Sequence, residues 1–145
     1  MSEFTNLAKD YYENGFSCSE SIIKAAYDSG IYKSNNIDEI FRIASMFSGG
    51  MSSGCLCGAV AGSQIILGCI FGRNISENIN LNKIIATDFI KKFKEKRKAT
   101  CCIALSAPYK HNPFERRQNC INIIEESAQI LENLVNSYLK EKIKA

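Results

Sequence analysis

Residues 57–71 read CGAVAGSQIILGCIF, the most apolar part of the chain. Its apolar residues lie on most sides of a helix rather than on one stripe, which is typical of a helix surrounded by other helices. The stretch is also shorter than the roughly 20 apolar residues that span a bilayer. We therefore expect residues 57–71 to form the central helix of a bundle, with no membrane insertion.

Outward from this stretch, apolar residues recur at intervals of three and four along almost the whole chain, and no segment alternates as a half-buried strand does. The predicted fold class is all-α, a single domain over residues 1–145 built as a compact bundle of about five to six helices. The expected helices cover residues 2–14, 17–30, 38–46, 57–71, 81–98 and 112–142, with a short turn at 101–105.

Capping residues support these boundaries. Ser17 and Glu20 have the spacing of a capping box, so that Cys18 becomes the first residue of its helix, and Gly30 ends that helix. The segment Asn112-Pro113-Phe114-Glu115 starts the last helix with a cap, a proline at the first helical position and a second box.

Composition excludes several classes of function. The 145 residues carry 18 basic and 15 acidic side chains, a net charge of +3, which is well below the basic excess of a dedicated nucleic-acid binder. The one histidine, His111, excludes a zinc site built from several imidazoles and leaves little material for a Cys-His relay. The N-terminus lacks the basic and apolar regions of a signal peptide, so we expect a reducing, cytoplasmic location.

The cysteines are the unusual feature of the chain. There are seven, and they occupy positions 18, 55, 57, 69, 101, 102 and 120. An odd number in a reducing compartment argues against a structural disulfide framework. It favours core packing, metal or cluster ligation, or reversible thiol chemistry.

Three of these cysteines fall at expected helix starts: Cys18, Cys57 and Cys102, the last behind Thr100 as a cap. Backbone N–H groups and the helix dipole stabilise a thiolate there, so we expect lowered thiol pKa values, and Cys18 and Cys57 to react faster than Cys69.

A fourth cysteine, Cys120, lies on the apolar stripe of the last helix, where it faces the bundle. Gly58 and Gly62, one turn apart, allow another backbone to come close to the start of the central helix. We expect Cys18, Cys57, Cys102 and Cys120 to meet in space.

The segment Cys57-Gly58-Ala59-Val60-Ala61-Gly62 resembles the CGAxxG signature of the C-GCAxxG-C-C family, small redox-active domains of about this length defined by four cysteines. Gly15-Phe16-Ser17-Cys18, Cys102-Ile103-Ala104-Leu105 and Cys120 resemble the other cysteine segments, and the resemblance covers about residues 7–134. The chain departs from the family at residues 97–100, where a phenylalanine and a glycine are expected. The doubled Cys101-Cys102 leaves two choices for the third cysteine, and Cys102 is favoured because Leu105 is then in phase.

The resemblance implies that Cys18, Cys57, Cys102 and Cys120 are the reactive residues. Thiol–disulfide or electron-transfer chemistry with an unidentified redox partner is the first hypothesis. Ligation of an iron–sulfur cluster or zinc by the same four cysteines is the second, with Gly58 and Gly62 as candidate cofactor-binding residues. A disulfide needs Cα atoms within about 7 Å, whereas a cluster tolerates a wider ring of sulfurs.

A third hypothesis of another class rests on residues 91–98, which carry six positive charges and could contact nucleic acid or an acidic protein. A solvated helix end is the favoured interpretation, and nucleic acid is not expected. Cys55 is interpreted as a loop residue, with ligation or thiol resolution as the alternative, and Cys69 as a core residue. His111 is expected in an exposed loop, with proton donation to a thiolate as the alternative. Homo-oligomerisation stays open.

Overall fold

Helices form all the regular secondary structure of the computed structural model, which describes the backbone of residues 2–144 and the side chains of residues 2–140. The helices are α1 (Glu3–Glu13), α2 (Cys18–Ser29), α3 (Ile37–Ser45), α4 (Gly58–Phe71), α5 (Leu81–Arg97), α6 (Cys102–Ser106) and α7 (Pro113–Lys144). No strand occurs within residues 2–144. The predicted all-α class is confirmed, with six helices of nine or more residues in this range and the short α6 in the place of the expected turn.

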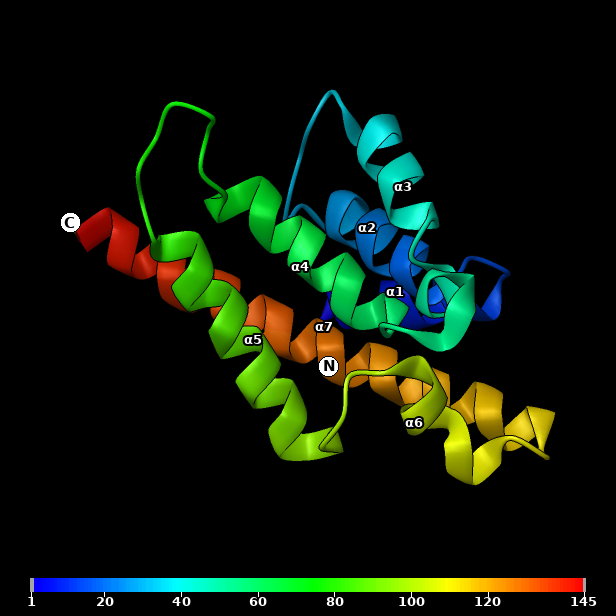
Figure 1. The fold of residues 1–145 in the computed structure, drawn as a ribbon. Coiled ribbons are helices and arrows are strands. Elements are labelled where there is room, and N and C mark those ends of the chain that lie inside the picture. Colours follow the sequence, from blue (N-terminus) through cyan, green and yellow to red (C-terminus); the bar gives the residue numbers. More distant parts are fainter. Residues whose placement is uncertain (1, 145) are drawn as a thin grey trace.

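Helix α4 is the central helix, as its composition predicts. It packs against α2, α3, α5 and α7, and Figure 1 shows it crossing the middle of the molecule between α5 on one side and α2 with α3 on the other. Its buried residues come from several sides of the helix, as in Val60, Ile66 and Phe71. Burial on most sides explains why this segment lacks a polar stripe.

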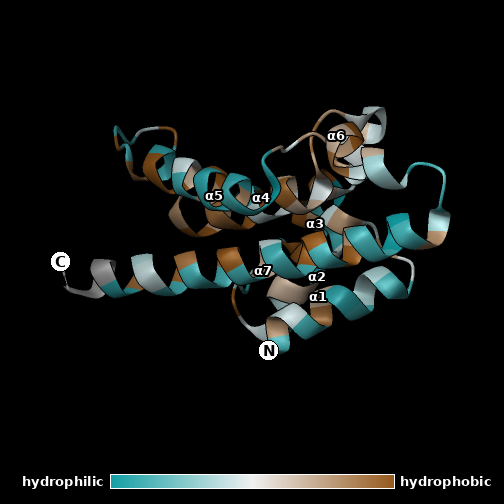
Figure 2. Cartoon of the chain, turned by 90° about the horizontal axis from the view of Figure 1, so that it is seen from below, coloured by the Kyte–Doolittle hydropathy of each residue, from teal (hydrophilic) through white to brown (hydrophobic). Residues whose placement is uncertain are grey.

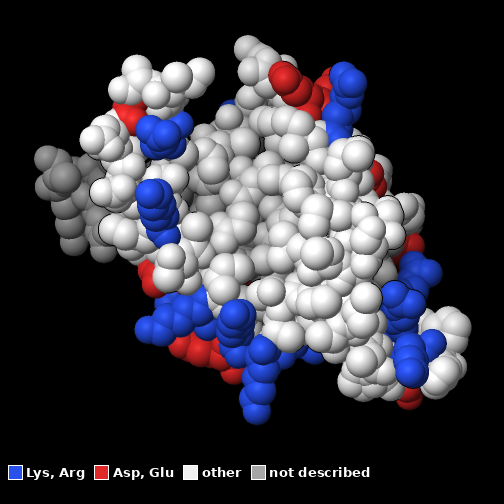
Figure 3. Space-filling view, viewed as in Figure 1, with Lys and Arg blue, Asp and Glu red and all other residues white. Residues whose placement is uncertain are grey.

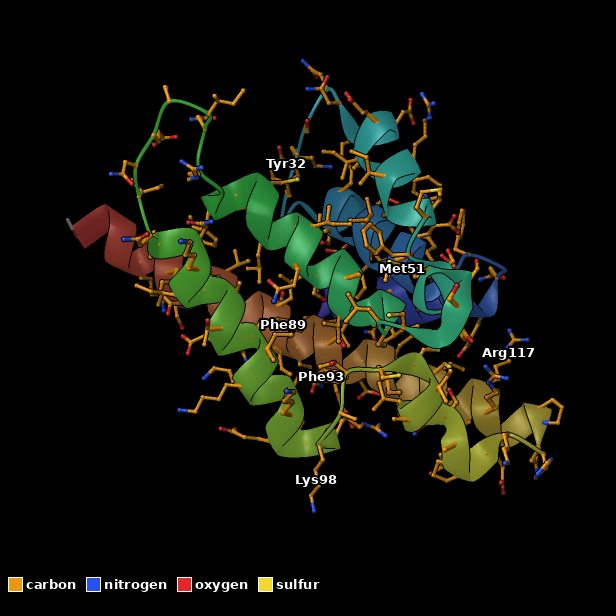
Figure 4. All side chains as sticks on the ribbon, viewed as in Figure 1. Tyr32, Met51, Phe89, Phe93, Lys98 and Arg117 are labelled. Atoms are coloured by element: carbon orange, nitrogen blue, oxygen red, sulfur yellow. The ribbon has the colours of Figure 1, made fainter. Side chains whose placement is uncertain are left out.

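Helix α7 supplies one side of the core along the length of the bundle. In Figure 2 it carries both hydrophobic and hydrophilic residues, as an amphipathic helix does. Ile124, Ala128 and Leu131, which lie on the predicted stripe, are fully buried. Figure 4 shows Phe89 and Phe93 on the part of α5 that faces this core, and both side chains are fully buried. These two aromatic side chains therefore pack α5 against the rest of the bundle.

The expected caps are present. The Ser17 backbone N–H donates to Glu20 Oε1 at 2.9 Å and the Glu20 N–H donates to Ser17 Oγ at 3.3 Å, which completes the capping box of α2. Asn112 Oδ1 accepts from the Glu115 N–H at 3.1 Å at the start of α7, which confirms the cap. The expected second box is not completed there, because the Asn112 N–H donates to the Tyr109 carbonyl oxygen at 3.0 Å. Cys18 is therefore the first residue of its helix, as predicted.

One predicted cap is wrong. Cys101, not Thr100, is the residue that precedes α6, and its side chain makes no capping hydrogen bond. The Thr100 carbonyl instead accepts a hydrogen bond from the Cys57 N–H at 2.7 Å. This hydrogen bond joins the segment before α6 to the segment before α4.

Charged side chains lie around the edge of the face shown in Figure 3, and its centre is almost free of them. Lysines at the end of α5 are exposed, whereas Arg97 pairs with Glu126 on α7. None of the helices over residues 2–144 offers the apolar stretch that a membrane span requires.

The contact between α2 and α4 depends on a glycine. A Cβ atom at Gly62 would lie 2.9 Å from the Ser19 carbonyl oxygen and 3.2 Å from Ile22 Cβ, so the two helices can approach this closely only without a side chain there. Ser19 and Ile22 are both fully buried and have little room to move.

We expect Gly62→Ala to lower the free energy of unfolding by about 1–3 kcal/mol, because the added methyl overpacks this contact. Gly68→Ala on the same helix is the matched control, since a Cβ there meets nothing within 4 Å. That substitution should raise stability by about 0.5–1 kcal/mol through helix propensity. Urea denaturation of both variants measures the difference, and equal stabilities would contradict the close approach.

Candidate functional site

The four predicted cysteines surround one cavity, here called the inner cavity. Cys18 comes from the start of α2, Cys57 from the residue before α4, Cys102 from the start of α6 and Cys120 from the second turn of α7. The cavity measures about 30 Å³, and its other lining side chains are mostly apolar. A space of this size admits little more than a water molecule. The predicted convergence of the four residues is therefore present in the fold.

An open groove, here called the outer groove, lies beside the inner cavity. It measures about 720 Å³ and runs between the connection from α1 to α2 and the first turns of α7. Cys18, Cys102 and Cys120 line both spaces, whereas Cys57 lines the inner cavity alone and is 7% exposed. Three sulfur-bearing residues are thus reached from the groove, and Cys57 lies behind them.

The structure separates the doubled cysteines. Cys101 donates its thiol hydrogen to the Gly54 carbonyl oxygen at 2.9 Å and does not line the inner cavity. Cys102 does line it. Of the two, Cys102 is therefore the one that belongs with Cys18, Cys57 and Cys120, in agreement with the choice made from the phase of Leu105.

Two glycines make room for Cys18 and Cys102. A Cβ atom at Gly58 would lie 2.3 Å from Cys18 Sγ, and one at Gly50 would lie 2.8 Å from Cys102 Cβ. Gly58 lines the inner cavity, whereas Gly62 contacts α2 and does not line it. Among the candidate cofactor-binding glycines, Gly58 is therefore the one beside the cysteines.

Gly50 belongs to a turn that sequence reasoning did not predict. Gly49, Gly50, Met51 and Ser52 have φ angles of 61°, 64°, 59° and 54°, a run in the left-handed region. Met51 and Ser52 pay a steric cost for this conformation that glycine does not. The cluster of Gly and Ser in residues 49–54 was a signal for an irregular turn, but the close packing of Gly50 against Cys102 is visible only in the folded chain.

Burial dominates the acid–base behaviour of the cysteines. It raises the pKa of Cys57 to about 12, although the backbone N–H groups of Val60 and Ala59 oppose the shift. Burial also raises the pKa of Cys18, against the stabilising N–H groups of Gly49 and Ser19. The expectation of lowered pKa values at these helix starts is therefore wrong, because loss of hydration outweighs the helix N-terminus.

Cys120 has a polar neighbour that the sequence did not single out. The Tyr12 hydroxyl and Arg116, one turn earlier on α7, both favour the thiolate of Cys120, yet burial leaves the pKa of Cys120 raised. Burial also raises the pKa of Tyr12. Tyr12 therefore stays protonated at neutral pH.

All seven cysteines lie in the described part of the chain and are free thiols. Within the side chains described, no three or more His, Cys, Asp and Glu residues are grouped so that they could hold a metal ion. The donor set around the inner cavity has the chemistry of a cluster or zinc site, but its arrangement here does not fit one.

The remaining candidates lie away from the inner cavity. Cys55 and His111 are exposed. Cys69 is half-buried rather than fully in the core, and burial raises its pKa although Tyr32 opposes the shift. Figure 4 shows Tyr32 well away from Arg117 beside the groove.

A hydrogen-bonded network that the sequence did not reveal fixes α6. Arg97 donates to both carboxylate oxygens of Glu126, at 2.7 and 3.0 Å, and to Asn119 Oδ1 at 3.1 Å. Asn119 in turn donates to the Leu105 carbonyl oxygen of α6 at 3.0 Å. Such bidentate pairs are among the strong interactions of folded proteins. One cation of the basic segment 91–98 therefore serves the structure rather than a ligand.

Comparison with protein families gives one finding. A family model described as "Putative redox-active protein (C_GCAxxG_C_C)" matches residues 16–134, which include all four cysteines of the inner cavity. Neither the curated proteins nor the solved structures gave a match to the chain.

The raised pKa values predict the pH profile of alkylation. Iodoacetamide reacts with the thiolate, so labelling of Cys18 and Cys120 in the reduced, folded protein should rise by about tenfold per pH unit from pH 7 to 9, without a plateau. Labelling of Cys57 should be slowest, because its side chain is buried and its pKa is about 12. Mass spectrometry of the labelled peptides measures each rate, with exposed Cys55 as the reference for access. A plateau near pH 7 at Cys18 would contradict the effect of burial.

Proposed function

This chain belongs to the C_GCAxxG_C_C family of redox-active proteins, and we propose that the four cysteines around its inner cavity form one thiol redox site within a single domain. The observation that carries the proposal is that residues more than a hundred positions apart, Cys18 and Cys120, line one small cavity together with Cys57 and Cys102. Thiols held this close to one another are suited to exchange with a disulfide.

The proposed cycle transfers two electrons. A thiolate from a cysteine that borders the outer groove attacks one sulfur of a disulfide substrate, forms a mixed disulfide and releases the first substrate thiol. A second site cysteine then attacks the protein sulfur of the mixed disulfide, forms a protein disulfide and releases the second substrate thiol. The two thiol protons end on the two released thiols, and a reducing partner reverses the cycle.

Burial suits both end states of this cycle, because neither carries a charge on sulfur. The thiols of Cys18, Cys57 and Cys120 have raised pKa values, so the reduced site holds neutral thiols rather than several neighbouring negative charges. A disulfide carries no charge and suits the apolar lining of the inner cavity equally well. A reducing, cytoplasmic environment, with an unidentified redox partner, is part of the proposal.

Ligation of an iron–sulfur cluster or zinc remains the second candidate because four soft donors border one cavity. It requires these side chains to rearrange, since their present placement does not group three ligands. Gly58, which lines the inner cavity and lies against Cys18, would then border the bound group.

The proposal predicts which cysteines form the disulfide. Protein purified anaerobically and treated with hydroxyethyl disulfide should lose two thiols and gain one internal disulfide between residues of the set Cys18, Cys57, Cys102 and Cys120. Thiol titration and peptide mapping identify the pair, and serine at either of its members should abolish the disulfide. Cys101→Ser is the matched control, because Cys101 is adjacent in sequence but points to Gly54.

Two results would contradict the proposal. A disulfide that involves Cys55 or Cys101 instead would remove the inner cavity from the chemistry. Iron or zinc bound in a stoichiometric amount, lost on substitution of the four cysteines, would replace thiol exchange by the second candidate.

The same burial predicts the redox potential. Strong oxidants among thiol proteins owe their potential to a stabilised thiolate, which the raised pKa values of Cys18 and Cys57 argue against here. We therefore expect a midpoint potential at or below about −230 mV, on the reducing side of the glutaredoxins. Equilibration in dithiothreitol buffers measures it, and a value near that of a strong oxidant, about −120 mV, would show that the thiolates are stabilised after all.

A further inference from the structure

The outer groove has the dimensions of a small-molecule site. Its volume of about 720 Å³ lies within the range of about 300–1,000 Å³ that such sites occupy. The inner cavity, at about 30 Å³, cannot hold a substrate of that size. Any molecule that exchanges with Cys18, Cys102 or Cys120 must therefore rest in the groove while it reacts.

The groove carries two guanidinium groups. Arg116 and Arg117 both line it, and both are exposed. Figure 4 shows Arg117 at the end of the molecule where α7 begins. Glu13 is the acidic residue of the groove, so the charged side chains sum to one excess positive charge. Planar guanidinium groups bind carboxylates in a bidentate manner.

The two arginines differ in the contacts that their side chains make. Arg117 Nη2 donates to the Glu13 carbonyl oxygen at 2.8 Å and so joins the end of α1 to α7. The Arg116 side chain makes no hydrogen bond or ion pair with the other described residues. Arg116 nevertheless lies one turn from Cys120 and acts on its thiol electrostatically. A cation that stabilises no other element, beside a cysteine of the site, is suited to a ligand.

We propose that the outer groove binds a low-molecular-weight thiol and its disulfide that bear carboxylates, with Arg116 as the principal carboxylate-binding residue. This inference rests on the proposed function and names its substrate class. One groove cysteine attacks the bound disulfide. The substrate gains two electrons and leaves as two thiols, and two site cysteines become a disulfide. The carboxylate contacts hold the disulfide sulfur beside the groove cysteines during the first step.

Three disulfides of different charge test the proposal: glutathione disulfide, which is anionic, hydroxyethyl disulfide, which is neutral, and cystamine, which is cationic. The rate at which each oxidises the reduced protein is divided by its rate with N-acetylcysteamine, a thiol without a charged group, which corrects for intrinsic reactivity. We expect the normalised rates to fall in the order anionic, neutral, cationic, and the differences to shrink as salt is added.

Arg116→Gln should lower the normalised rate with glutathione disulfide by about two- to fivefold, in keeping with one exposed carboxylate contact. Because Arg116 also acts on the Cys120 thiol, the rates with the two charged disulfides are compared with the rate for hydroxyethyl disulfide in the same variant. The ratio for glutathione disulfide should fall and the ratio for cystamine should rise, opposite changes that neither loss of structure nor a shift in the pKa of Cys120 produces. Lys92→Gln, an exposed cation on α5, is the matched control and should alter none of the rates. Arg117→Gln serves as a second variant, with thermal unfolding as a check because it joins α1 to α7.

The outcomes separate the two proposals. If the folded protein reacts with hydroxyethyl disulfide but shows no preference for charge, or if Arg116→Gln leaves every ratio unchanged, the carboxylate-binding groove is overturned and thiol exchange stands. If none of the three disulfides oxidises the reduced, folded protein, the proposed function itself fails.

Discussion

The contact on which the cysteine site depends is that of Cys18 with the start of α4. The sulfur occupies the space that a side chain at Gly58 would fill, with a would-be Cβ atom 2.3 Å away. One turn later Gly62 lets α2 continue along α4 at the same close distance. Because Cys57 precedes α4, this approach brings its thiol and that of Cys18 to one cavity. The positions of Cys102 and Cys120 then complete the enclosure from α6 and α7.

Enclosure has an electrostatic consequence. Backbone N–H groups point at the sulfurs of Cys18 and Cys57, as helix starts do, yet the pKa of each thiol is raised because the surroundings exclude water. Each thiolate would also repel its neighbours across the cavity. The site therefore favours states without net charge on sulfur. Reaction with another molecule has to begin at the cysteines that line the outer groove.

Local sequence signals predicted local structure well. The capping box at Ser17 and Glu20, the proline start at Pro113 and the apolar surface of α4 each fixed an element without help from the rest of the chain. What depends on distant contacts was missed. The helix-start argument for Cys18 omitted burial, which only the assembled bundle determines, and α6 begins after Cys101 rather than after Thr100.

Helix α6 has only five residues, too few for a helix that holds its shape unaided. Its carbonyl at Leu105 is held by Asn119, and Asn119 is held by Arg97, which is paired with Glu126. Side chains on α5 and α7 therefore hold Cys102 in position through α6. Substitutions there, none of which touches sulfur, can loosen this one segment while the bundle stays folded. The stability of the bundle and the arrangement of its thiols therefore respond to different substitutions. A variant can keep its fold while Cys102 loses its position beside the other three cysteines.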